Sequence, residues 1–164
     1  MSRQHIISML LENEAGALSR VSGLFSARAY NIESLTVAPT LDPTLSRLTL
    51  VTVGSDETIE QIKKQLNKLI DVVKLVDLSE SFSLERELAL FKVKKNDAIV
   101  QKIEELGSDS LARITDETDD FLIIELTGEK VWLDDFLNSL KGEVIEVVRT
   151  GVIGLSRGER SLTL

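Results

Sequence analysis

The stretch 11-LENEAGALSRVSGLF-25 changes from the pattern of a β-strand to that of an α-helix within a few residues. The apolar residues after the change recur at the spacing of one helix face: Leu18, Val21, Leu24 and Phe25. Asn13 and Gly16 lie in the turn between the two patterns, where few side chains are bulky. We therefore expect a short strand-to-helix turn with unpaired backbone N–H groups at the start of the helix.

The rest of the first half continues the alternation of strands and helices. Residues 5–12 form the strand before the turn, and further strands are expected over 31–39, 47–54 and 72–78, with an Asp-Pro turn over 41–46. A second helix is expected after Ser55 or Asp56, and its predicted buried stripe consists of Ile59, Ile62, Leu66, Leu69 and Ile70. The predicted order is β-α-β-β-α-β.

The second half repeats this order more faintly. Strands are expected over 85–94 and 143–156, a hairpin over 110–128, and helices over 98–106 and around 133–140. The sequence thus predicts an α+β protein of two ferredoxin-like βαββαβ domains, each with its helices on one face of an antiparallel sheet. The expected boundaries are 1–78 for the first domain, 79–86 for a linker and 87–164 for the second domain. Domains this small often gain stability by pairing with another copy, so we expect an oligomer.

Composition excludes several classes of protein. The chain has 164 residues, 43% of them hydrophobic, and no cysteine, so a disulfide framework and thiolate chemistry are excluded. No apolar run reaches the roughly 20 residues that span a bilayer, and no signal peptide is recognisable. The net charge is −8, and most of it falls in residues 79–164, which disfavours nucleic-acid binding. We expect a cytoplasmic protein that binds neither membranes nor nucleic acid.

The residues needed for catalysis or metal binding are not brought together by the sequence. His5 is the single histidine and is expected at the surface near a strand end, so neither a catalytic triad nor a His/Cys metal site is predicted. The acidic pairs 119–120 and 134–135 are expected at a solvated turn and at a helix start. The glycine-rich segment 151–159 lacks the spacing of a phosphate loop and is expected to form a turn or a bulge.

The turn around Gly16 is the feature that points to a ligand. The exposed N–H groups and the helix dipole together favour an anion such as a carboxylate, and Gly16 lets a ligand approach the backbone. Asn13 either caps the helix or binds the ligand through its amide. Asn31 and Ile32 add an amide and an apolar surface, so the set fits a small aliphatic amino acid. The alternative is that Asn13 is only a cap and Gly16 only a tight turn.

Residues 10–52, "LLENEAGALSRVSGLFSARAYNIESLTVAPTLDPTLSRLTLVT", closely resemble the start of the small, regulatory subunits of acetohydroxyacid (acetolactate) synthase. The likeness extends over residues 5–53 and resumes in "LERELALFKVK" and "VIEVVRTGVIGLSRGE". The resemblance implies that the first domain is an ACT domain. It also implies a chain that is not itself an enzyme and that needs no cofactor.

The resemblance further implies a catalytic large subunit as partner, which would carry thiamine diphosphate, Mg²⁺ and FAD and join two 2-keto acids on the route to branched-chain amino acids. The small subunit would activate this partner and confer feedback inhibition by valine. Two ACT domains would pair side by side as a homodimer, with the effector at their interface. The family's effector residues match Asn13 and Gly16, with Asn31 and Ile32 from the facing subunit; we expect the carboxylate of valine on the N–H groups near Ala15, Gly16 and Ala17.

The sequence is also compatible with a second function of a different class. A free-standing amino-acid sensor built on an ACT domain would carry the same turn and the same fold, but it would have no enzyme partner. Mixing the chain with the large subunit separates the two functions, because a sensor would leave the production of acetolactate unchanged.

Overall fold

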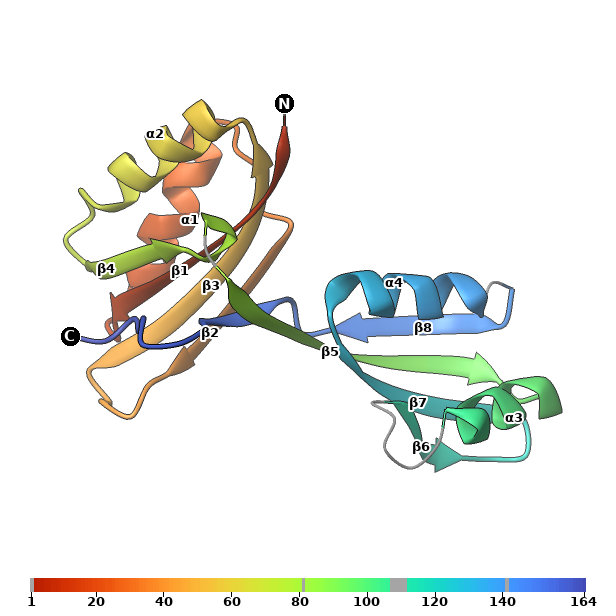
Figure 1. Ribbon diagram of the computed structural model, residues 1–164. Coiled ribbons are helices and arrows are strands. Elements are labelled where there is room, and N and C mark those ends of the chain that lie inside the picture. The colour runs from red at the N-terminus through yellow and green to blue at the C-terminus, as the bar shows by residue number, and fades with distance from the viewer. Residues whose placement is uncertain (1, 81, 107–111, 141) are drawn as a thin grey trace. The chain divides into compact units, whose positions relative to one another are not determined.

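The computed structural model describes residues 2–80, 82–106, 112–140 and 142–164, and the chain divides into two units (Figure 1). Unit 1 comprises Met1–Leu84 together with Val152–Leu164, and unit 2 comprises Glu85–Gly151. Each unit contains four antiparallel strands and two helices in the order β-α-β-β-α-β among its described residues, and a further strand, β9 (Ile153–Ser156), extends the second sheet by pairing with β5 (Ser83–Lys94). The predicted α+β class with two ferredoxin-like domains is confirmed.

Unit 1 is built around its first strand, which lies inside the sheet. The strand order is β2-β3-β1-β4, with β2 and β4 at the edges. The elements are β1 (Arg3–Glu12), α1 (Ala17–Ala27), β2 (Ser34–Pro39), β3 (Leu45–Gly54), α2 (Asp56–Leu66), β4 (Val72–Asp77) and the short 3₁₀ helix η1 (Leu78–Glu80). β1 and β3 pair over their full length from Arg3 opposite Gly54 to Glu12 opposite Leu45.

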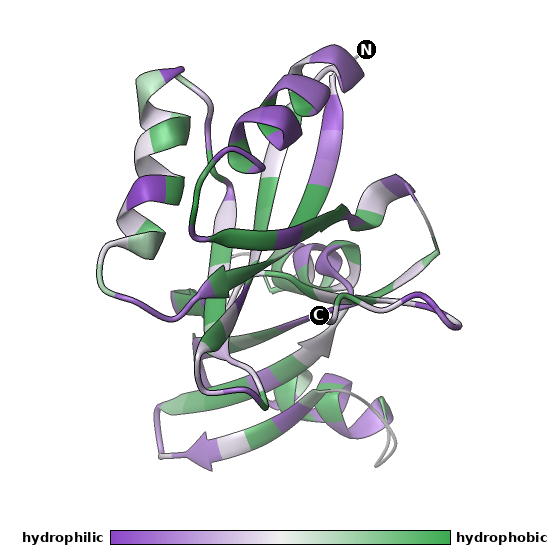
Figure 2. Cartoon of the chain, turned by 90° about the vertical axis from the view of Figure 1, so that its left-hand side faces the viewer, coloured by the Kyte–Doolittle hydropathy of each residue, from purple (hydrophilic) through white to green (hydrophobic). Residues whose placement is uncertain are grey.

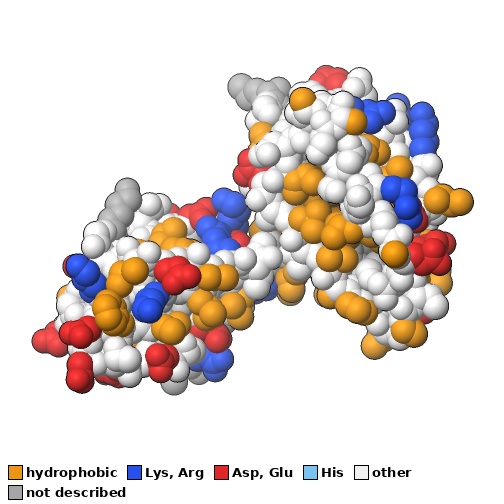
Figure 3. All heavy atoms as spheres, turned by 180° about the vertical axis from the view of Figure 1, so that it is seen from behind, with side chains coloured by type: hydrophobic (Ala, Val, Ile, Leu, Met, Phe, Trp, Pro, Cys, Tyr) orange, Lys and Arg blue, Asp and Glu red, His pale blue; other side chains and the backbone are white. Residues whose placement is uncertain are grey.

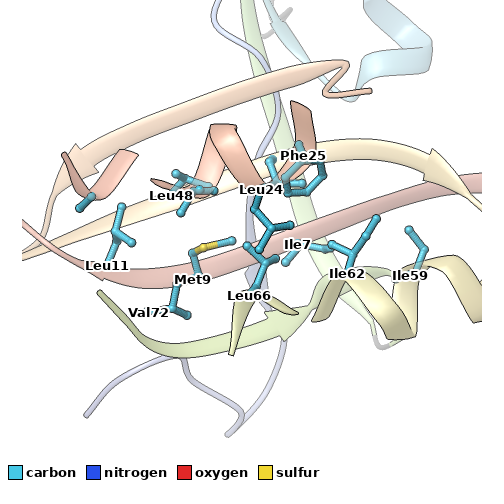
Figure 4. Close-up of a cluster of buried hydrophobic side chains, with 13 residues drawn as sticks. Ile7, Met9, Leu11, Leu24, Phe25, Leu48, Ile59, Ile62, Leu66 and Val72 are labelled. Carbon is cyan, nitrogen blue, oxygen red and sulfur yellow. The ribbon is translucent and has the colours of Figure 1, made fainter. Parts of the chain in front are cut away.

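The core of unit 1 lies between one face of this sheet and the two helices. Alternate residues of β1 point into it, because side chains alternate across a strand; these are Ile7, Met9 and Leu11 (Figure 4). The helices contribute one stripe each, which includes Phe25 from α1 and Ile62 from α2. Ile70 was predicted in the second stripe, and that prediction is wrong: α2 ends at Leu66, and Ile70 is 86% exposed in the following turn.

The opposite face of the same sheet is covered by the end of the chain. Val152 packs with Ile6, Val51 and Leu78 in a second buried cluster, and Leu162 is also buried. Two cationic side chains of the sheet bind backbone carbonyls of this segment: Arg47 Nη2 donates to Gly154 O over 3.0 Å, and Lys74 Nζ donates to Thr163 O over 2.8 Å.

This return of the chain alters the expected boundaries. The strand predicted over 143–156 is two strands, β8 (Val144–Arg149) and β9 (Ile153–Ser156), separated by Gly151 with a φ of 84°. β9 pairs with β5, whose first residues belong to unit 1. Residues 152–164 therefore belong with the first unit and not with 87–150, and residues 83–86 lie in β5 rather than in a linker.

Unit 2 repeats the topology with the strand order β6-β7-β5-β8. Its elements are β5 (Ser83–Lys94), α3 (Asp97–Glu105), β6 (Ala112–Glu117), β7 (Phe121–Gly128), α4 (Lys130–Ser139) and β8. Alternate residues of β5 and β7, among them Phe91 and Ile124, pack against Ile103 of α3 and Phe136 of α4. Figure 2 shows the hydrophobic residues, in green, along the strands. The predicted hairpin over 110–128 is present, although its first two residues lie outside the described residues.

Candidate functional site

The turn between β1 and α1 is held by its neighbour, the loop between β2 and β3. The backbone N–H of Asn13 donates to Thr44 O over 2.8 Å, and its side-chain Nδ2 donates to Pro43 O over 3.0 Å. Asn13 therefore fastens the turn to the loop and does not cap the helix, which corrects one of the two roles that the sequence suggested. The loop is itself braced, because the hydroxyl and the amide of Thr44 both donate to Asp42 and hold the pKa of that carboxyl below its usual range.

Gly16 is the N-cap of α1, and its backbone is left-handed, with a φ of 90°. No side chain caps this helix, and no acidic residue lies in its first turn, within the fully described segment Ala17–Ala27. The first hydrogen bond inside the helix joins the Arg20 amide to the Gly16 carbonyl over 2.9 Å, so the amides of Leu18 and Ser19 have no acceptor in the helix. The start of α1 thus presents N–H groups and the positive end of the helix dipole, as the sequence predicted.

A guanidinium group lies directly beside the turn. Arg20 donates through Nε and Nη2 to the two carboxylate oxygens of Asp71, over 2.6 and 2.7 Å, and the Asp71 side chain is only 3% exposed. These hydrogen bonds from Arg20 hold the pKa of the Asp71 carboxyl below its ordinary value. A Cβ atom at position 16 would lie 2.8 Å from Arg20 Nη1. Glycine is therefore favoured at position 16 by its φ, and a larger residue would also shift the guanidinium of Arg20.

A hollow of about 270 Å³ opens next to the turn. Its lining comes from the end of β1, the turn, the start of α1 and the facing ends of β2 and β3, and it consists of Leu11, Glu12, Asn13, Glu14, Ala17, Leu18, Val37, Ala38, Pro39 and Ser46. The volume lies just below the usual range for ligand sites, so it suits a small metabolite rather than a large cofactor. Leu18, predicted on the buried stripe of α1, is 40% exposed and faces this hollow instead.

The six residues proposed for the effector from the sequence separate into two groups. Asn13 and Ala17 line the hollow, and Ala15 and Gly16 form the turn above it. Asn31 and Ile32 lie at the other end of β2: the Asn31 carbonyl accepts from Thr52 Oγ1 over 2.7 Å, and Ile32 packs on the core. Thr52 is seven residues along β3 from Leu45, a separation of roughly 23 Å. One chain therefore does not bring the two groups together.

Two features around the turn were not predicted from the sequence: the apolar wall of the hollow and an ion pair beside the turn. The apolar wall of the hollow uses Val37 and Pro39 of β2, which alternate on one side of an edge strand, a pattern that the sequence does show. The pair of Arg20 and Asp71 joins residues far apart in the chain, and no local pattern reveals it.

The remaining titratable groups suggest no second reaction centre. His5 was expected at the surface, and this is wrong: it is 1% exposed, and its Nδ1 lies 2.9 Å from Asp77 Oδ2. The expectation failed because the partner strand β4, which supplies Asp77, buries this end of β1. Among the described residues, no cluster of three or more His, Cys, Asp or Glu side chains could hold a metal ion. No helix in the described part of the chain is long and apolar enough to cross a membrane.

Comparison with known proteins finds a matching family model for each half of the chain. Residues 7–74 match the family model "AHAS small subunit-like ACT domain", and residues 86–158 match the family model "Small subunit of acetolactate synthase". The chain is 50% identical to the acetolactate synthase small subunit of Haemophilus influenzae, over 97% of this chain and 99% of that protein. It is 47% identical to the acetolactate synthase isozyme 3 small subunit of Escherichia coli, over 96% and 98%.

The structure leads to the same group of proteins. The crystal structure of the acetolactate synthase small subunit from Thermotoga maritima superimposes with a TM-score of 0.84 at 38% identity, and the match covers 96% of this chain and 99% of that one.

Proposed function

The chain belongs to the family of acetolactate synthase small subunits, and from this premise we propose that it activates a catalytic large subunit in the cytoplasm and makes it sensitive to feedback by valine. The chemistry on 2-keto acids would take place in the large subunit, with its thiamine diphosphate, Mg²⁺ and FAD. One observation carries the regulatory part of the proposal. The start of α1 lacks a side-chain cap and opens beside a hollow of metabolite size.

The charges around the hollow suit a zwitterion. The carboxylate of an amino acid would bind the N–H groups from Ala15 to Ala17, where the helix dipole favours negative charge. Its ammonium group would lie near the carboxylates of Glu12 and Glu14, which line the same hollow. A branched aliphatic side chain would pack on the apolar wall that Leu18, Val37 and Pro39 form. Valine meets all three requirements.

A homodimer would complete the site. β2 is an edge strand of the sheet of unit 1, and an edge strand readily pairs with another copy. In an antiparallel pair, the start of one strand faces the end of the other. Twofold pairing of β2 would therefore bring Asn31 and Ile32 of one subunit towards the turn of its partner. The two groups that one chain keeps apart would meet at this interface.

Ligand binding would then be linked to subunit arrangement. A ligand shifts an equilibrium only by the difference in its affinity for the two states. An effector that binds at the interface senses the geometry of both subunits, so a coupling free energy of roughly 1–3 kcal/mol to the large subunit is a reasonable expectation. A change of this size corresponds to a severalfold to hundredfold change in apparent affinity.

The experiment is a reconstitution of the holoenzyme with the variant Gly16→Asp. A carboxylate at position 16 would occupy the place of the ligand's carboxylate and displace Arg20. We expect the variant to raise the activity of the large subunit like the wild type, but with valine inhibition abolished. Gly23→Asp is the matched control, because Gly23 lies in the same helix with open space around it; it should remain sensitive to valine.

Three results would overturn parts of this proposal. Normal binding of valine to Gly16→Asp in calorimetry would show that the site is elsewhere. A monomer at working concentrations, measured by light scattering, would exclude the interface. A wild-type chain that binds valine but leaves acetolactate production by the large subunit unchanged would instead be a free-standing sensor.

A further inference from the structure

A second hollow lies in unit 1 on the outer side of its helices. It has a volume of about 390 Å³, and its lining consists of Arg28, Tyr30, Gln61, Lys64, Gln65, Asn67 and Lys68. Three of these seven residues are cations, and none is an acid. The hollow is separate from the turn at Gly16, because Arg28 follows the other end of α1, roughly 16 Å along an 11-residue helix.

The three cations of this hollow take no part in the ion pairs of the described residues. Arg3, Arg20, Lys63, Lys95 and Arg149, among others, lie within 4 Å of a carboxylate. Arg28, Lys64 and Lys68 have no such partner among the carboxylates of the described residues. The chain has 27 acidic and 19 basic residues, and this hollow gathers three of the cations with no acidic residue in its lining. The surface therefore offers positive charge that the chain itself does not neutralise.

The other lining groups add hydrogen-bond donors to this positive charge. Arg28 Nη2 donates to Gln65 Oε1 over 3.1 Å, which fixes the guanidinium against α2 and leaves its other N–H groups free to face outwards. Gln61 and Asn67 add side-chain amides, and both are exposed. Five lining residues are exposed, whereas sites for small molecules enclose most of their ligand. The hollow thus suits acidic side chains on a protein surface better than an enclosed small anion.

We propose that this basic hollow is where an acidic segment of the catalytic large subunit docks on the small subunit. The inference rests on the proposed function, since that function requires a surface for the large subunit. Charge complementarity across an interface increases the rate of association and selects the partner. Within one chain, the hollow and the effector turn lie at opposite ends of α1, so a partner at the hollow would not cover the turn of the same chain.

The test is a titration of the large subunit with variants of the small subunit, with acetolactate production as the readout. The double variant Lys64→Glu/Lys68→Glu should raise the concentration needed for half-maximal activation roughly tenfold or more, and Lys64→Gln/Lys68→Gln should have a smaller effect. Added NaCl should weaken activation by the wild type more than activation by the reversed variant. The control is Arg160→Glu, an exposed residue outside the hollow, which should titrate like the wild type.

Calorimetry of valine binding to each isolated small subunit is the control for folding. We expect the affinity of every variant for valine to equal that of the wild type. Activation curves for the double variant that coincide with the wild type would overturn the docking proposal. Binding of inorganic phosphate to the hollow, detected by chemical shifts lost in the double variant, together with unchanged activation, would make it a small-anion site instead. If the wild type itself fails to activate the large subunit, the proposed function fails, and the result is distinguishable from a failure of the docking surface alone.

Discussion

The first helix of unit 1 and the first helix of unit 2 occupy the same place in two copies of one topology, yet they begin differently. α1 starts at Gly16 without a side-chain cap or an acidic residue in its first turn. α3 starts at Asn96, whose Oδ1 accepts from the Ile99 amide over 2.9 Å, and Asp97 follows in the first turn. At the start of α3 the chain itself supplies the negative and hydrogen-bonding groups that a helix start attracts.

The difference shows how one fold can serve two purposes. A capped helix start gains about 1 kcal/mol of stability and leaves nothing for a ligand to bind. The uncapped start in unit 1 forgoes this gain, and the adjacent hollow and the pair of Arg20 with Asp71 give its free amides a defined environment. The effector site is therefore proposed at the start of α1, whereas at α3 the side chain of Asn96 already binds the amide of Ile99.

The largest expected effect tests whether the two units, which have separate cores, also unfold independently. Phe25 and Phe91 are each 1% exposed, in different cores. Truncation of either to alanine should cost about 3–5 kcal/mol in the unit that holds it. Trp132, the single tryptophan, lies in α4 of unit 2, so its fluorescence reports on that unit, while far-ultraviolet circular dichroism reports on both.

With Phe25→Ala, the fluorescence midpoint in urea should stay close to that of the wild type while part of the dichroism signal is lost earlier. With Phe91→Ala, the fluorescence midpoint itself should fall. Shifts of both probes together in both variants would mean that the chain unfolds as one cooperative unit.

The next effect concerns the glycine at the uncapped start. Gly16→Ala places a side chain at a φ of 90°, which should cost about 1–2 kcal/mol, and it displaces Arg20. Gly23→Ala makes the same change inside the same helix, where there is open space, and should stabilise by about 0.5–1 kcal/mol because alanine favours a helix. Urea denaturation of both variants measures the change in the free energy of unfolding, which should be negative for Gly16→Ala and positive for Gly23→Ala. Equal effects at the two positions would contradict the special role of Gly16.

A smaller effect is expected at the capped start. Asn96→Ala removes the acceptor for the Ile99 amide and should lower the stability of unit 2 by about 1 kcal/mol. Valine affinity in calorimetry should be unaffected, because α3 is not part of the proposed site. A loss of valine binding in this variant would show that the two helix starts are not functionally distinct.

The smallest expected effect is a dependence of stability on pH, caused by the carboxyl of Asp71, which pairs with Arg20 of α1 in unit 1. The pKa of Asp71 is lower in the folded protein, so its contribution to stability is present above the ordinary carboxyl pKa, near 4, and is lost as the pH falls through the lowered value. The difference in melting temperature between wild type and Asp71→Asn should be constant from pH 7 to about pH 4.5 and shrink below that. A difference that grows as the pH falls would have the wrong sign.

The sequence predicts the elements of both units well because the determining patterns are local. The alternation in β1 and the stripe around Val21 and Phe25 depend on neighbours in the chain. The open helix start was predicted for the same reason, since Gly16 lacks a side chain wherever it lies. One of the two roles predicted for Asn13, that of a helix cap, is wrong, because its side chain binds Pro43, thirty residues away, instead.

Contacts over long distances in the chain account for the other differences. His5 is buried because Asp77 faces it from another strand, and Ile70 is exposed because α2 stops four residues earlier. Nothing in the segment 151–156 reveals that it pairs with β5 and packs with unit 1, so its return to unit 1 could be found only from the fold.

That return also determines the order in which the protein can be completed during translation. Ile6 and Val51 leave the ribosome early, but Val152, which covers them, is made only after all of unit 2. At roughly 5–20 residues per second, the nascent chain holds this apolar surface bare for several seconds. The inserted unit can finish folding first, and residues 152–164 then complete unit 1.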